Sequence, residues 1–195
     1  VELRVEAGAF EHLDEALGKK GRRFLPSFSR KPRKLHGFIL DRGRLALPSD
    51  DFFQSDPVRL IEIFHLADLY ALEIHPLAMR AARRDARLID QKIRRDDRAN
   101  QLFLDTLCSP RNPEAVLRWM NEATVFGRFI PDFGRVVAQM QFDMYHHYTV
   151  DEHSIRAIGL LAEIERGDLK EDHPLSTAIV RQIVSRRVLF VAVLL

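Results

Sequence analysis

Prolines behind capping residues fix where several helices of this chain begin. The pairs are Asp56-Pro57 and Asn112-Pro113, and Pro76 supplies a third start. Proline is favoured at the first helical position, and a preceding Asp or Asn side chain can accept a bond from a free backbone N–H of the first turn. After the first start, apolar residues recur at steps of three and four and predict a helix with one apolar face. They are Leu60, Phe64, Ala67, Ala71 and Ile74.

Further helices follow in the same manner. The helix from Pro76 is expected to continue to about Lys92, with the arginines from Arg80 to Arg87 on a solvated face. A third helix runs through Leu102, Phe103 and Leu107 and stops near Ser109-Pro110, and a fourth starts at Asn112-Pro113. Gly127 and Pro131 indicate a connection, and another helix is expected around Val136, Val137 and Met140. The spacing of these elements is typical of a helical bundle.

The first fifty residues contain the only expected strands. Residues 37–40 and 44–47 flank Asp41-Arg42-Gly43, and Gly43 can adopt the positive φ of a tight turn. This pattern predicts a small β-hairpin. The fold class is therefore mainly α, a helical bundle with a small β-hairpin near the N-terminus.

Composition excludes several classes of protein. The chain has 195 residues, of which 46% are hydrophobic, so a sizeable core is available. Cys108 is the single cysteine, which excludes an internal disulfide and a cysteine-cluster zinc site and favours a cytoplasmic setting. The apolar run Val188–Leu195 is shorter than the roughly 20 residues of a membrane span. We therefore expect no membrane partner. We interpret this run as a core helix or strand that continues in a longer protein. The first residue, Val1, is not Met, which favours the same interpretation for the amino end.

Basic residues are concentrated near the amino end. Eight Lys and Arg residues lie between Lys19 and Lys34, without an acidic residue among them, while the net charge of the whole chain is only +2. Such a run can bind phosphate groups. However, Phe24, Pro26 and Phe28 interrupt it, and a solvated loop explains the basic residues equally well. We expect no nucleic-acid partner.

One histidine lies in the first turn of a predicted helix and is a candidate metal ligand. Thr149-Val150-Asp151-Glu152 fits a capping box, which places His153 in the first full turn. The apolar residues that follow at helical spacing predict that His153 lies on the apolar face, where it can serve as a metal ligand or as a core histidine bonded to a backbone carbonyl. These residues are Ala157, Leu160, Leu161 and Ile164.

Other residues near this start have competing interpretations. Asp151 and Glu152 complement the positive end of the helix dipole, and we favour that structural role over direct metal or water binding. One of the adjacent histidines His146 and His147, together with Tyr145 or Tyr148, can line a pocket, while packing or surface exposure is the favoured alternative. Arg128 and Arg135 flank Pro131-Asp132 and can contact a phosphate, while buried pairing with Asp132 is the alternative.

Several blocks resemble one bacterial family. They are residues 35–38, 50–59, 120–123, 127–135, 139–146 and 148–153, with Gly127-Arg128-Phe129-Ile130-Pro131-Asp132-Phe133-Gly134-Arg135 as the most specific run. Together they resemble the bifunctional protein-P-II uridylyltransferase/uridylyl-removing enzymes. The resemblance implies a nucleotidyltransferase that attaches UMP from UTP to the P-II nitrogen-regulation protein, an HD-type phosphohydrolase domain that removes it, and glutamine as effector of the intact enzyme.

The resemblance also implies where this chain lies within such an enzyme. Residues 1–55 would end the nucleotidyltransferase region, 56–145 would form a helical linker domain, and 146–195 would contain the first helices of the all-α HD domain. His153 matches the first histidine of the HD ligand set for Mg²⁺ or Mn²⁺, and the family's His-Asp pair would come directly after Leu195. No complete catalytic set is expected here, so the isolated fragment is expected to be inactive. The alternative is a helical scaffold that docks P-II without catalytic residues of its own.

Overall fold

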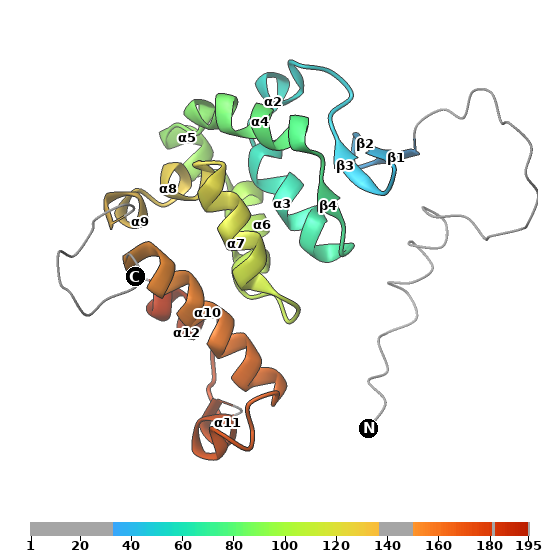
Figure 1. The fold of residues 1–195 in the computed structure, drawn as a ribbon. Helices are drawn as coiled ribbons and strands as arrows, with labels where there is room; N and C mark the ends of the chain where they lie inside the picture. Colours follow the sequence, from blue (N-terminus) through green and yellow to red (C-terminus); the bar gives the residue numbers. More distant parts are fainter. Residues whose placement is uncertain (1–32, 137–149, 181, 195) are drawn as a thin grey trace, which may run out of the picture.

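The computed structural model describes residues 33–136, 150–180 and 182–194 and is mainly helical (Figure 1). A small sheet lies at the start of the described part. Its strands are β1 (Arg33–Leu35), β2 (Phe38–Asp41), β3 (Arg44–Ala46) and β4 (Glu73–Ile74), in that order across the sheet. The first three are antiparallel, and β4 runs parallel to β3.

Two tight turns connect the antiparallel strands. His36 and Gly37 have φ of 51° and 90°, and Arg42 and Gly43 have φ of 49° and 82°. Two successive positive φ values match the twist of a two-residue hairpin, which explains the glycine at the second position of each turn. The predicted hairpin around Gly43 is confirmed, and a second hairpin and β4 extend it into a four-stranded sheet.

The expected helix after Asp56 is shorter than its sequence pattern indicated. Helix α2 (Phe52–Ser55) precedes it, and α3 (Arg59–Leu69) buries Leu60, Phe64 and Ala67 as predicted. The extension through Ala71 and Ile74 is wrong. Ala71 adopts φ of 50°, which stops the helix, and Ile74 lies in β4 instead.

The helix from Pro76 is also broken. Its first part, α4 (Pro76–Asp85), is followed by a 3-10 turn, η1 (Ala86–Leu88), and by α5 (Gln91–Arg94). Asp85 is buried at the break, and Asp90 caps the new start by accepting a bond from the Ile93 N–H at 3.0 Å. One continuous helix to Lys92 was therefore an incorrect prediction, because polar side chains end and restart it.

The central helices follow their capping signals. Helix α6 (Asp97–Leu107) is capped by Asp96, which accepts from the Ala99 N–H at 2.9 Å. Helix α7 (Pro113–Glu122) is capped by Asn112, which accepts from the Ala115 N–H at 3.1 Å. The predicted start at Asn112-Pro113 is confirmed, and α3, α6 and α7 pack against one another.

The expected connection around Gly127 and Pro131 is helical. It forms α8 (Val125–Phe129) and α9 (Pro131–Val136). Phe126 packs on Phe103 of α6 with ring centroids 5.6 Å apart and stacks on Phe133 at 3.9 Å. A Cβ at Gly134 would lie 2.5 Å from the Gly127 carbonyl oxygen, so the close approach of the two short helices requires glycine at position 134. Of the next predicted helix, Val137 and Met140 lie outside the described residues.

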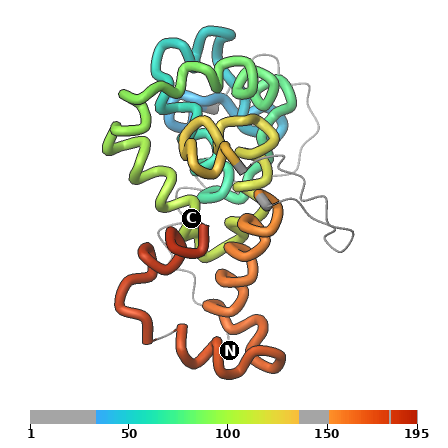
Figure 2. The backbone as a smooth tube through the Cα atoms, turned by 90° about the vertical axis from the view of Figure 1, so that its left-hand side faces the viewer, coloured from blue at the N-terminus to red at the C-terminus, as the bar shows by residue number. Residues whose placement is uncertain are grey.

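Three helices form an arm on this body. Helix α10 (Val150–Arg166) packs on α7 and extends away from the other helices, α11 (Pro174–Val180) lies at its far end, and α12 (Arg186–Leu194) returns beside it (Figures 1 and 2). Phe190 of α12 is fully buried. Residues 188–194 of the apolar run are thus helical, one of the two predicted alternatives, and they contribute Phe190 and Leu194 to the core. Among the described helices, none has the length and apolar character of a membrane span.

Charged side chains join α10 to α7. Glu114 accepts hydrogen bonds from Arg118 (2.9 Å) and from Arg156 of α10 (2.8 Å), and Arg118 also pairs with Glu152 of α10. Burial would raise the pKa of Glu114, but the bonds from Arg156 and Arg118 outweigh it and hold that pKa below its usual value. A Cβ at Gly159 would collide with the Glu114 side chain, so the network needs glycine at that position.

The phenylalanine cluster should dominate the stability of α8 and α9. Phe126 is fully buried, so we expect Phe126→Ala to lower the free energy of unfolding by about 3–5 kcal/mol. Leu77→Ala, at a side chain that is 63% exposed, should cost less than about 0.5 kcal/mol. Urea unfolding of the two variants measures the difference, and equal costs would contradict the assigned core.

The Glu114 network should make part of the stability depend on pH. Because the folded-state pKa of Glu114 is lowered, its contribution is present above the unfolded pKa and is lost as pH falls through the folded value. Glu114→Gln should lower the free energy of unfolding by roughly 1 kcal/mol at neutral pH and have little effect in strong acid. Glu171→Gln, at an exposed side chain, is the matched control and should change neither value. A Glu114→Gln effect of the same size at both pH values would rule out this assignment.

Candidate functional site

The first turn of α10 is held on α7 through two carboxylates. Asp151 is buried, and its Oδ2 accepts a hydrogen bond from Asn121 Nδ2 at 3.0 Å. Glu152 pairs with Arg118, one helical turn away from Asn121 along α7. Both carboxylates therefore anchor the helix start, the kind of structural role that the sequence favoured. Tyr148 and Thr149 lie outside the described residues, so the predicted capping box stays a prediction.

His153 is exposed, although the sequence placed it on a buried face of α10. The buried face is formed by Asp151, Ile155, Ile158 and Ala162, and His153 is exposed. Asp151 and His153 are two residues apart, which is about 200° around a helix. His153 shares its side of α10 with the apolar residues that the sequence used to place it, but this side is not the buried one. The expectation that this face is buried is thus wrong, and within the described structure His153 is not a core histidine.

The residues that follow His153 at helical spacing are only partly buried. They are Ala157, Leu160, Leu161 and Ile164. This second face of α10 contains the apolar pattern that the sequence displayed, but α7 covers the other one. An exposed imidazole on a helix that is anchored at its start can meet ligands from outside this helix.

A complete metal site is not present in the described part of the chain. No group of three His, Cys, Asp or Glu side chains in residues 33–136, 150–180 and 182–194 has an arrangement that could hold a metal ion. A divalent ion needs several converging ligands. The described residues therefore do not fit a metal by themselves, and His153 can supply at most one donor of a larger set.

Helix α12 returns toward the start of α10. Arg186, at the beginning of α12, pairs with Glu165 near the end of α10, so the two neighbouring helices run antiparallel. The nine residues from Arg186 to Leu194 span about 12 Å along the helix axis. Leu194 consequently lies level with the middle of α10, and α12 points toward the end that contains His153 (Figure 1).

Arg128 and Arg135 border a shallow hollow of about 450 Å³ between α5, α7, α8 and α9. Arg135 pairs with Asp132 at 2.9 Å, so the predicted pairing is present, but both side chains are exposed and not buried. Arg94 of α5 adds a third guanidinium to the hollow and donates to the Arg128 carbonyl oxygen at 3.3 Å. Sequence reasoning missed Arg94, because no motif or spacing connects it to Arg128.

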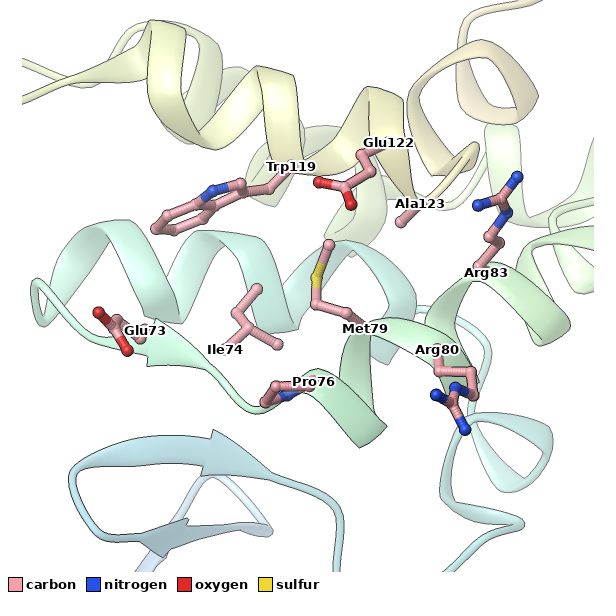
Figure 3. A pocket seen from close by; sticks show the side chains of 9 residues that line it. All are labelled: Glu73, Ile74, Pro76, Met79, Arg80, Arg83, Trp119, Glu122 and Ala123. Carbon is pink, nitrogen blue, oxygen red and sulfur yellow. The ribbon is translucent and has the colours of Figure 1, made fainter.

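A larger cavity of about 560 Å³ lies between α4, β4 and α7 (Figure 3). Ile74, Met79 and Trp119 form its apolar part. Arg80 and Arg83 lie on its α4 side, and Glu122 lies on its α7 side (Figure 3). The sequence assigned these arginines to a solvated face, and they are exposed, but they also border a cavity that forms only when α4 meets α7.

Cys108 is not suited to nucleophilic chemistry. Its side chain is buried between α6 and α12, and this burial raises the pKa of the thiol. Arg186 and Arg187 oppose the shift but do not reverse it. The thiolate is the reactive form of cysteine, so a raised pKa makes this residue inert at neutral pH.

Comparison with known families and proteins shows what this chain is similar to. Residues 38–129 match the family described as "Uridylyltransferase GlnD third domain". The chain is 61% identical over 183 residues to the bifunctional uridylyltransferase/uridylyl-removing enzyme of Novosphingobium aromaticivorans, a match that covers 94% of this chain and 20% of that protein. It is 56% identical over 185 residues to the enzyme of the same name from Erythrobacter litoralis, with the same coverage. No solved structure matches.

The family match and the two enzymes agree on one assignment. The match begins at β2 and ends with α8, and the identity to the enzymes extends it over nearly the whole chain. The chain spans 20% of the length of these curated relatives. It belongs to the family of bifunctional uridylyltransferase/uridylyl-removing enzymes.

Proposed function

We propose that this chain is the part of a bifunctional enzyme that supports its UMP-removing site. The intact enzyme would transfer UMP from UTP to the P-II protein and remove it by hydrolysis of the phosphodiester. Within it, the body from β2 to α9 would hold α10, and α10 would supply His153 as one ligand of an HD-type site for Mg²⁺ or Mn²⁺. Such an ion supplies an activated water and charge stabilisation on phosphate.

The direction of α12 is the observation that carries this proposal. The first turn of α10 is fixed by Asn121 and Arg118 in an orientation that exposes His153. Antiparallel α12 then leads the chain back toward the same end of α10. A continuation of α12 by about one turn beyond Leu194 would reach the level of His153. The His-Asp pair that the family resemblance predicts directly after Leu195 would thus come near this imidazole.

The other predicted residues would act indirectly. Asp151 and Glu152 would position the helix start through α7, and neither would need to contact the metal. Arg128, together with Arg94, would give the hollow between α5, α7, α8 and α9 a positive charge that suits a phosphate or an acidic surface. We propose that the isolated chain catalyses neither reaction, since no group of three His, Cys, Asp or Glu side chains in its described part could hold a metal ion.

Substitution of His153 in the intact enzyme tests this function. His153→Ala should lower the rate of UMP removal by at least roughly a hundredfold, because a metal ligand is lost, and should leave UMP transfer within about twofold. Both rates can be followed with radiolabelled UMP on P-II. His173→Ala, at another exposed histidine, is the matched control and should alter neither rate. Normal removal by the His153→Ala enzyme would disprove the assignment.

A further inference from the structure

The cavity between α4, β4 and α7 has the features of a groove for an extended peptide. One wall is β4, which lies at the end of the strand order β1-β2-β3-β4. Its outer edge is not paired with another strand in the described part of the chain. An open strand edge beside an apolar pocket is the arrangement that proteins use to add a peptide strand.

The backbone of β4 is oriented for such an addition. In a parallel pair, alternate residues of one strand bond to the neighbouring strand. The His75 N–H donates to the Leu45 carbonyl oxygen at 2.8 Å, and Leu45 lies opposite Ile74. Ile74 therefore turns its own N–H and C=O away from β3. In Figure 3 the cavity lies on the side of β4 opposite the sheet, and the Ile74 side chain points into it.

The apolar part of the groove would take a bulky side chain. Trp119, Met79 and Ile74 are partly buried and surround the centre of the cavity (Figure 3). Partly buried Trp and Met side chains are frequent anchors for protein partners.

The charges of the groove are separated between its walls. Neither Arg80 nor Arg83 forms an ion pair with the residues that the structure describes, whereas their neighbour Arg84 pairs with Asp85 at 2.7 Å. Glu73 is neutralised by Arg44 at 2.7 Å, and Glu122 on α7 is the remaining carboxylate of the lining. An acidic residue of the peptide would therefore lie toward α4 and a hydrogen-bond donor toward α7.

We infer that this groove docks the protein substrate of both reactions. The bound part would be an extended segment of that substrate with a bulky apolar residue and an acidic residue close by. The inference rests on the proposed function, in which the same protein is the acceptor of UMP and the carrier from which UMP is removed. One docking groove on the helical body would then serve both reactions, since it binds the protein and takes no part in the chemistry.

Kinetics of the intact enzyme test the groove, with P-II and UMP-bound P-II as the probes. The double variant Arg80→Glu/Arg83→Glu should raise the KM for the protein substrate roughly tenfold in both transfer and removal. Because these side chains are exposed, folding should be kept. Trp119→Ala should raise the same KM by removing the apolar anchor, while kcat and the KM for UTP stay unchanged in both variants. Arg87→Glu reverses an exposed charge outside the groove and should change no constant.

Two results would overturn the inference. An unchanged KM for the protein substrate in both reactions would show that the groove does not dock it. A loss of kcat or a higher KM for UTP, without a change for the protein, would show that the groove holds another part of the enzyme. Neither result depends on His153, whose substitution affects removal alone and acts on kcat, so the groove and the proposed function can fail separately.

Discussion

The contact between α7 and the start of α10 is the constraint on which the arrangement of the arm depends. Glu114, Arg118 and Asn121 all project from α7, and each bonds to a residue of α10. These partly shielded charge pairs contribute modestly to stability, but they fix the rotation of α10 about its own axis. Rotation decides which side chains α10 buries and which it exposes, so the position of His153 follows from residues on another helix.

Because α7 fixes the orientation of α10, the helical body would contribute to both proposed reactions, UMP transfer and UMP removal. The body is continuous from the sheet to α9 through one hydrophobic core, and that core includes Phe190 of the arm. A rigid body of this kind can hold one site in place and at the same time offer a groove for the protein that both reactions share.

The sequence predicted correctly those helix starts and turns that depend on interactions between residues close together in the chain. The starts at Asn112 and Pro76 and the turn at Gly43 were readable, because capping bonds and a positive φ involve residues within a few positions. The break at Ala71 and the helices around Gly127 were not, because they depend on packing with distant residues. The burial of the face that contains His153 was misjudged for the same reason. Asp151 is drawn inward by Asn121, thirty positions earlier, and a periodicity of apolar residues contains no information about that bond.

The central claim is that His153 is a metal ligand held outward by an anchored helix. Electron spin-echo spectroscopy of the intact enzyme loaded with Mn²⁺ measures directly which nitrogens bind the ion. We expect a histidine nitrogen coupling that is present in the unmodified enzyme and in His173→Gln, and one coupled nitrogen fewer in His153→Gln. The same nitrogen coupling in His153→Gln as in the unmodified enzyme would contradict the account.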